Sequence, residues 1–298
     1  MASPAYQYGA LSAVLEEYVL QTNDTHYARL FSPETGYLKC EGKSQTWAVS
    51  YAPPKNPEMF LANLVAVREG LRGQKALAIS NALHLIQRVN QVYCDAVFGT
   101  GEIPVMKGGV IGFNSRCKDV TQVLSNFFSS LLIFPDPLTD SDVVFPDSES
   151  AYQAHKRLGV GVHPSLPLDT APSDGMERKE TGPSTEHFTR GSGGPLRAKK
   201  LGESPRLKGE KKPPLTNEMA AAKYQLMSQI IKAKLAANTF VVDRLKRTGD
   251  AFLVEDTGKV SFWGGDPGDL SLGQQKCPIT KDSQNVLGTI LMHQRSQL

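Results

Sequence analysis

Helical spacing of apolar residues dominates the second half of the chain. Between Asn217 and Ala237 apolar side chains recur every three or four residues, which predicts one amphipathic helix. Lys223 and Lys234 fall on one face of this helix with two apolar residues between them. Either these lysines lay their stems over the core and reach water, or one ammonium group enters a pocket and meets a phosphate.

A second helical pattern follows Asn285 near the end of the chain. Asn285 and Gly288 share one face of this predicted helix, while Leu287, Ile290 and Leu291 occupy another. Gly288 has no side chain, so another backbone or a ligand could come close to it. Asn285 is either a hydrogen-bonding core residue or a ligand contact.

A polar helix is predicted to begin near Pro146. Asp147 can accept hydrogen bonds from the free first-turn amides, and Glu149 lies where the helix dipole favours an anion. Glu149, Gln153 and Lys156 are spaced i, i+4, i+7 and therefore project from one face. This face is a candidate site, and a plain helix-start acid is the alternative reading of Glu149.

The first hundred residues predict a β-α-β-α order. The four elements are a strand at 46–51, an amphipathic helix at 57–71, a buried strand at 76–79 and a helix at 81–97. This order is typical of a small α/β unit, which we place at residues 1–106.

Part of this unit weakly resembles a ribonuclease H-like domain, on Asn63–Leu71 and Ala78–Asn81. Asn63 and Ser80 stand where that family carries metal-binding carboxylates, so the unit could not hold two metal ions. The resemblance implies a catalytically empty unit that docks a protein partner.

Residues 159–214 interrupt the apolar pattern. They hold eight of the 19 prolines, nine glycines and a single aromatic residue, Phe188. Such a segment buries too little apolar area to offset its ordering entropy, so we expect a disordered insertion. A solvated linker, phosphate attraction or a nuclear-import signal would each explain its basic tract, which comprises Arg197, Lys199, Lys200, Arg206, Lys208, Lys211 and Lys212.

Composition narrows the class of protein further. The 298 residues are 40% hydrophobic, but no apolar run is long enough to cross a bilayer, so we expect a soluble protein of the cytoplasm, or of the nucleus if the basic tract is an import signal. The four cysteines are widely separated and form no metal-ligand pair; we expect reduced thiols, no metal and no cofactor. A net charge of +3 does not by itself imply a nucleic-acid partner.

Two segments at the middle of the chain carry a family resemblance. A Leu-Ser-Asn-Phe segment at 124–127 is followed by Ser-Glu-x-x-x-Gln-Ala-x-Lys at 148–156, and Val110-Ile111-Gly112-Phe113 precedes both. These segments are followed by four later motifs, and all of them stand in the order found in the NADAR family. The chain therefore resembles this family over residues 109–298, and Val110–Phe113 resembles its short opening strand. Those later motifs are Thr248-Gly249-Asp250, Leu253-Val254-Glu255, Phe262-Trp263-Gly264 and Asn285–Arg295.

The resemblance implies an α+β fold, a mostly helical domain with a few short strands at residues 107–298, preceded by the small α/β unit. It also implies hydrolysis of an N-glycosidic bond in ADP-ribosylated or ribosyl-amine substrates, including ADP-ribosylated nucleic acid. Glu149 would stabilise an oxocarbenium-like ribose and orient water. Lys156 would be essential, either pairing with a phosphate or attacking the open-chain sugar as a neutral amine.

Further candidate contacts follow from the same resemblance. Trp263 would stack on a base or ring, and Asn126 and Gln153 would hydrogen-bond ribose or base edges. The other candidates are Phe113, Lys234, Gly264 and Asn285, and plain core packing is the alternative for Phe113 and Trp263.

Two departures from the family pattern bear on turnover. Met219 stands where a tryptophan is usual, and Val260 stands where an aspartate is usual. Methionine stacks less well than an indole, and valine cannot accept a proton. The alternative function is therefore a catalytically impaired reader or scaffold that binds ADP-ribose or another nucleotide.

Overall fold

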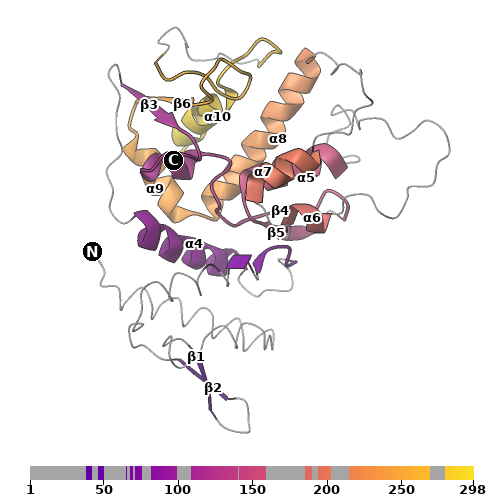
Figure 1. Cartoon of the computed structure of the whole chain (residues 1–298), viewed down its shortest axis with the longest axis vertical. Coiled ribbons are helices and arrows are strands. Elements are labelled where there is room, and N and C mark those ends of the chain that lie inside the picture. Colours follow the sequence, from indigo (N-terminus) through magenta and orange to yellow (C-terminus); the bar gives the residue numbers. More distant parts are fainter. Residues whose placement is uncertain are drawn as a thin grey trace, which may run out of the picture.

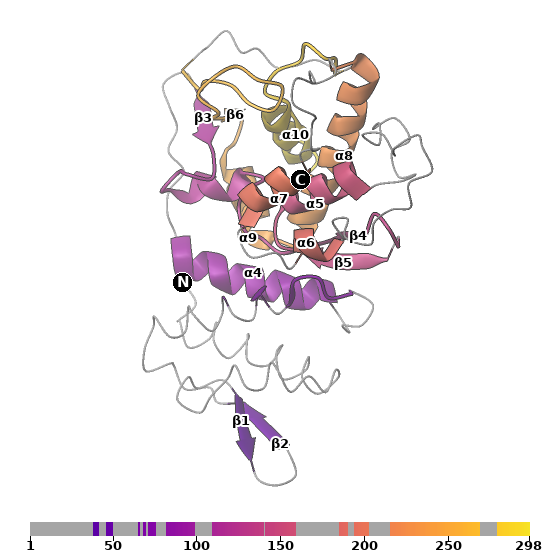
Figure 2. The same ribbon diagram turned by 45° about the vertical axis from the view of Figure 1, so that its right-hand side comes forward.

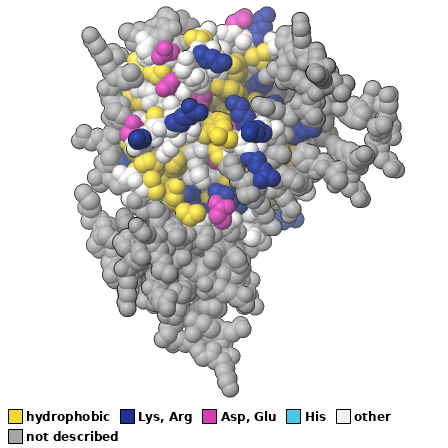
Figure 3. Space-filling model, in the orientation of Figure 1, with side chains coloured by type: hydrophobic (Ala, Val, Ile, Leu, Met, Phe, Trp, Pro, Cys, Tyr) yellow, Lys and Arg dark blue, Asp and Glu magenta, His cyan; other side chains and the backbone are white. Residues whose placement is uncertain are grey.

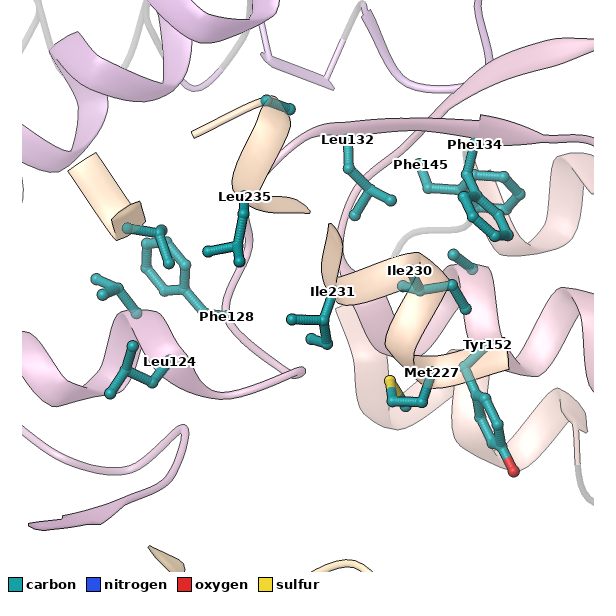
Figure 4. Close-up of a cluster of buried hydrophobic side chains, with 14 of the residues drawn as sticks. Leu124, Phe128, Leu132, Phe134, Phe145, Tyr152, Met227, Ile230, Ile231 and Leu235 are labelled. Carbon is teal, nitrogen blue, oxygen red and sulfur yellow. The ribbon is translucent and has the colours of Figure 1, made fainter. Parts of the chain in front are cut away.

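The longest described helix, α8 (Asn217–Ala236), runs through the body of the protein (Figure 1). The Thr216 side chain caps it by accepting a hydrogen bond from the Met219 amide at 3.2 Å. Met227, Leu235 and other apolar side chains on its inner face are buried among those of the neighbouring elements, and Ile230 and Ile231 are fully buried (Figure 4). The helix predicted at 217–237 is thus confirmed to within one residue.

The computed structural model describes most of the chain after residue 81 and short stretches before it. The described residues are 38–41, 46–49, 65, 68–69, 71–75, 82–98, 109–139, 141–158, 185–189, 194–202, 215–268 and 279–298. Its other helices are α4 (Ala82–Phe98), the 3-10 helix η2 (Val120–Leu124), α5 (Ser148–Leu158), α6 (Thr185–Thr189), α7 (Gly194–Gly202), α9 (Thr239–Arg247) and α10 (Val286–Arg295).

The described strands form three two-stranded sheets. Two are antiparallel: β1 (Leu38–Glu41) with β2 (Thr46–Val49), and β4 (Leu132–Pro135) with β5 (Asp142–Phe145). The third is parallel and joins distant segments, β3 (Val110–Phe113) and β6 (Phe252–Glu255). Few short strands among many helices confirm the predicted α+β class.

The core joins elements from both sides of the predicted boundary at residue 106. Leu85, Ile86 and Val89 of α4 belong to the same hydrophobic cluster as the residues of α8, and α4 runs along one edge of this body in both ribbon views (Figures 1 and 2). The Val144 backbone also exchanges hydrogen bonds with Gly73 and Gln74 at 2.8 and 3.0 Å. The boundary therefore does not separate two cores.

The rest of the predicted first unit is described only in part. Helix α4 and strand β2 confirm the helix predicted at 81–97 and the strand predicted at 46–51. The strand predicted at 76–79, most of the helix at 57–71, and Asn63 and Ser80 lie outside the described residues.

Two helices correct the prediction that residues 159–214 are disordered throughout. Helices α6 and α7 lie in this segment and pack against α5, with the side chains of Phe188 and Ala198 buried. The low apolar content of the segment hid these two anchors. The remainder of 159–214 lies outside the described residues.

None of the helices that the structure describes combines the length and the apolar character needed to cross a bilayer.

Candidate active site

The start of α5 is fixed by its own cap. Asp147 accepts a hydrogen bond from the Ser150 amide at 2.7 Å, as predicted from the sequence. Asp147 is buried, and burial raises its pKa to about 7 against the opposing effect of this hydrogen bond. The cap orients the first turn of α5, which carries Glu149.

The Glu149 carboxylate is buried and held by two amides. Only 5% of the residue is exposed. Asn126 Nδ2 donates to Oε2 at 2.6 Å and Gln153 Nε2 donates to Oε1 at 2.7 Å, while the Glu149 amide donates to the Asn126 carbonyl at 3.0 Å. Burial raises the pKa of Glu149, whereas the bond from Gln153 and the charges of Lys199 and Lys156 lower it.

The two amides also present unused acceptors at this site. Asn126 Oδ1 and Gln153 Oε1 are buried, and neither accepts a hydrogen bond from any described residue. A buried acceptor without a donor is costly, of the order of 1–3 kcal/mol, and uncommon in proteins. These two oxygens are therefore suited to accept hydrogen bonds from the hydroxyl or amino groups of a ligand.

A second buried carboxyl group lies at the end of β6. Glu255 is 6% exposed; its amide donates to Asn285 Oδ1 at 3.1 Å, and its carbonyl accepts from the Gly265 amide at 2.9 Å. No described residue donates a hydrogen bond to its carboxylate. Burial, and then the nearby charge of Glu149, raise its pKa to about 8.

Glu255 belongs to one of the motifs seen in the sequence but is not among the predicted site residues. Its position after the apolar residues Leu253 and Val254, followed directly by Asp256, was the available signal. An acid in that position is equally suited to a solvated turn, so only the fold distinguishes a turn residue from a buried one.

Gly264 and Asn285 contact the backbone of Glu255, and Trp263 precedes Gly264 in the same turn. The Trp263 ring meets the Tyr152 ring of α5 edge-on, with centroids 5.4 Å apart. A Cβ built on Gly264 would overlap the Glu255 carbonyl oxygen, so this close approach requires glycine. Asn285 Nδ2 donates to the Leu253 carbonyl at 2.8 Å, which makes its side chain a bridge between α10 and β6.

The backbone at the start of α10 is adapted to this bridge. Asn285 has a φ of 49°, in the left-handed region that asparagine tolerates better than most residues. A Cβ on Gly288 would overlap the Leu253 carbonyl oxygen, so Gly288 admits another backbone, one of its two predicted uses. Asn285 takes the core hydrogen-bonding role of its two alternatives.

Lys234 has its ammonium group in the core, not in water. It is 1% exposed, and Nζ donates to the Ser125 carbonyl at 2.7 Å. Ser125 precedes Asn126, so this bond helps to place the amide that holds Glu149. Burial lowers the pKa of Lys234 to about 7.

The remaining predicted residues lie at different depths. Lys156 is half-buried further along α5, within electrostatic reach of Glu149. Phe113 is fully buried in the core and is the strand partner of Glu255. Direct hydrogen bonds thus join Asn126, Glu149 and Gln153, while Phe113 lies in the core behind Glu255.

A lysine of α7 also belongs to the site. Lys199 is exposed, its Nζ lies 5.9 Å from the centroid of the Phe127 ring, and its charge lowers the pKa of both Glu149 and Glu255. Lysine and arginine side chains gather on the face where α5 and α7 lie (Figure 3). From the sequence, Lys199 is predicted only as part of the basic tract, because the packing of α7 on α5 depends on the fold.

No three described histidine, cysteine, aspartate or glutamate side chains are grouped so that they could hold a metal ion. Of the cysteines that the structure describes, Cys94 and Cys117 are free thiols.

Comparisons with known proteins place the chain in a family. No curated protein matches it. Among solved structures, the NMR structure of the E. coli protein YbiA is similar, at 24% identity and a TM-score of 0.40, over 67% of this chain and 91% of that chain. The family model for the NADAR domain matches residues 112–298, which is more than half of the sequence. The chain therefore belongs to the NADAR family.

Proposed function

We propose that this chain hydrolyses the N-glycosidic bond of an ADP-ribosylated or ribosyl-amine substrate. The observation that carries this proposal is the Glu149 carboxylate, buried and held by Asn126 and Gln153. Cleavage of an N-glycoside passes through a ribose with oxocarbenium character, which a fixed carboxylate near C1 stabilises. A buried carboxylate already held in place does this without reorganising during the reaction.

The neighbouring amides suit a ribose ligand. Asn126 Oδ1 and Gln153 Oε1 are buried acceptors beside the carboxylate, and ribose hydroxyls are donors. In this proposal the two amides hold Glu149 with their nitrogens and the sugar with their oxygens. Trp263, half-buried beside Tyr152, stacks on the base or ring.

Two lysines fit the charge of a phosphorylated substrate. Lys199 and Lys156 both act electrostatically on Glu149, so a phosphate close to the ribose would lie within their field. Lys156 keeps its second proposed role, attack on the open-chain sugar as a neutral amine.

The direct test uses the full chain with two substrate classes. ADP-ribosylated guanine nucleic acid should release ADP-ribose, or a ribosylated riboflavin precursor should release ribose 5-phosphate. Glu149→Gln keeps the shape of the side chain but removes its charge, and it should lower the rate at least about 1000-fold. The matched control is Glu218→Gln, at a fully exposed acid in the first turn of α8, which should leave the rate unchanged. Absence of product from both classes with the unchanged protein would refute the proposal.

A second candidate function is a reader that binds the nucleotide without cleaving it. It is favoured by Val260, which is 45% exposed at the turn before Trp263 and supplies no carboxylate there. Calorimetry with ADP-ribose separates the two: heat of binding without product from either substrate class supports the reader. No heat with any nucleotide, together with no product, removes both candidates.

A further inference from the structure

Two motif residues predicted to touch a ligand, Asn285 and Gly264, instead fix the backbone of Glu255. Asn285 accepts the hydrogen bond of the Glu255 amide, and Gly264 leaves room for the Glu255 carbonyl. Trp263 packs its ring against Tyr152, on the helix that carries Glu149. Gly265, which follows directly, donates a hydrogen bond to the Glu255 carbonyl. The turn at 263–265 therefore contacts both the end of β6 and α5.

The carboxyl group so placed has no structural use within the described residues. None of them donates a hydrogen bond to this carboxyl group, although only 6% of Glu255 is exposed. A carboxyl group on a buried residue, fixed by its backbone and without a hydrogen-bond donor among the described residues, is suited to act on a ligand. It is also close enough to Glu149 for the two charges to affect each other.

The two carboxyl groups differ in what surrounds them. Glu149 accepts hydrogen bonds from two amides, which favour its ionised form. Glu255 accepts no hydrogen bond from described residues and lies near the negative charge of Glu149. A proton is therefore more stable on Glu255 than on Glu149. The charged groups that act on Glu255 from neighbouring elements are Glu149 of α5, Lys199 of α7 and Lys234 of α8.

We propose that Glu255 is a catalytic residue, the general acid that protonates the leaving nitrogen while Glu149 stays ionised; this assignment rests on the proposed function. The C1–N bond breaks, its electron pair moves to nitrogen, and nitrogen takes the Glu255 proton. Water then adds to C1 and gives its proton to Glu149. Exchange with solvent returns a proton to Glu255 and removes one from Glu149, which restores the starting state.

The leaving group provides the test. An amino or guanine nitrogen leaves as an anion unless it is protonated, whereas an N-ribosyl pyridinium such as nicotinamide mononucleotide leaves as a neutral molecule without a proton. Glu255→Gln should therefore lower kcat about 100-fold or more on the first kind of substrate. It should change kcat less than about threefold on the pyridinium, which wild type also hydrolyses under this proposal. Retained turnover of the pyridinium also shows that the variant folds.

The outcomes separate this assignment from the proposed function. Equal losses on both substrates, or no loss on either, would overturn the assignment of Glu255 while the proposed function stands. A wild-type protein that hydrolyses neither substrate overturns both. Glu218→Gln is again the control, because that carboxyl group is fully exposed on α8.

Discussion

The start of α5 and the end of β6 each bury one carboxyl group, and they hold it in different ways. At α5 the side chain itself is held, because Asn126 and Gln153 donate to both oxygens of Glu149. At β6 the backbone is held, because Asn285 and Gly265 bond the amide and carbonyl of Glu255. The comparison teaches that burial alone does not assign a role: donors at the carboxylate favour charge, and their absence favours a proton.

The largest effect on stability should come from breaking the support of β6. Gly288→Ala would force a Cβ into the Leu253 carbonyl oxygen, and we expect a loss of about 3 kcal/mol in the free energy of unfolding. Urea denaturation measures it. Gly268→Ala is the control, because its Cβ would meet only the Asp266 side chain, whose nearest atom is 3.2 Å away and can move. Equal stability of the two variants would contradict the close approach of α10 to β6.

Removing one hydrogen-bond donor from Glu149 should make its carboxylate resemble that of Glu255, which accepts no hydrogen bond from described residues. Asn126→Ala leaves Oε2 without its 2.6 Å partner, so the ionised form of Glu149 loses support and its pKa should rise further. We expect kcat to fall about 30- to 100-fold at pH 7 and the acidic limb of the pH–rate profile to move to higher pH. Asn217→Ala, at an exposed asparagine at the start of α8, should leave the profile unchanged. A fall in rate with an unmoved acidic limb would show that Asn126 acts on the ligand alone.

Lys234 connects the two regions, since it bonds Ser125 beside Asn126 and acts electrostatically on Glu255. Its pKa falls from 10.5 to about 7 on folding, so the unfolded chain binds more protons between these values and stability should rise with pH. Lys234→Met should remove up to about 1.4 kcal/mol per pH unit of this slope.

Denaturation midpoints between pH 9 and pH 10 measure that slope, above the midpoint near 8 at which Glu255 titrates. Lys246→Met, at an exposed lysine of α9, is the control. An identical slope in Lys234→Met and wild type would contradict a buried ammonium group.

The smallest effect should come from Lys199, which acts on both carboxyl groups from the surface. Lys199→Ala should raise KM about three- to tenfold with little change in kcat, and the increase should shrink at high salt. Lys200→Ala, the next residue of α7, should change KM less. A larger effect of Lys200→Ala would show that Lys200, and not Lys199, faces the phosphate.

The sequence predicted the elements whose pattern is local. The helix at 217–237, the Asp147 cap and the use of Gly288 follow from spacing, capping preference and the missing side chain, and all three are confirmed. The NADAR assignment followed from the order of short motifs and is confirmed by the family model.

The rest depends on contacts between distant segments. Helix α7 lies in a proline- and glycine-rich segment whose few apolar anchors act only once they meet α5. The placement of Glu255 needs β6, α10 and the turn at Gly264 together, and its burial cannot be predicted from the pattern of residues along the chain. For Lys234, spacing could not distinguish an ammonium group in water from one bonded to a carbonyl in the core.

The most direct test of the account is a pH titration of the glutamate carboxyl carbons by NMR in the full chain, assigned with Glu149→Gln and Glu255→Gln. We predict that Glu255 keeps its proton through pH 7, with a midpoint near 8, and that Glu149→Gln lowers this midpoint by removing a nearby negative charge. A Glu255 midpoint near the ordinary 4.5, unchanged in Glu149→Gln, would contradict the pairing of an ionised and a protonated carboxyl group at one site.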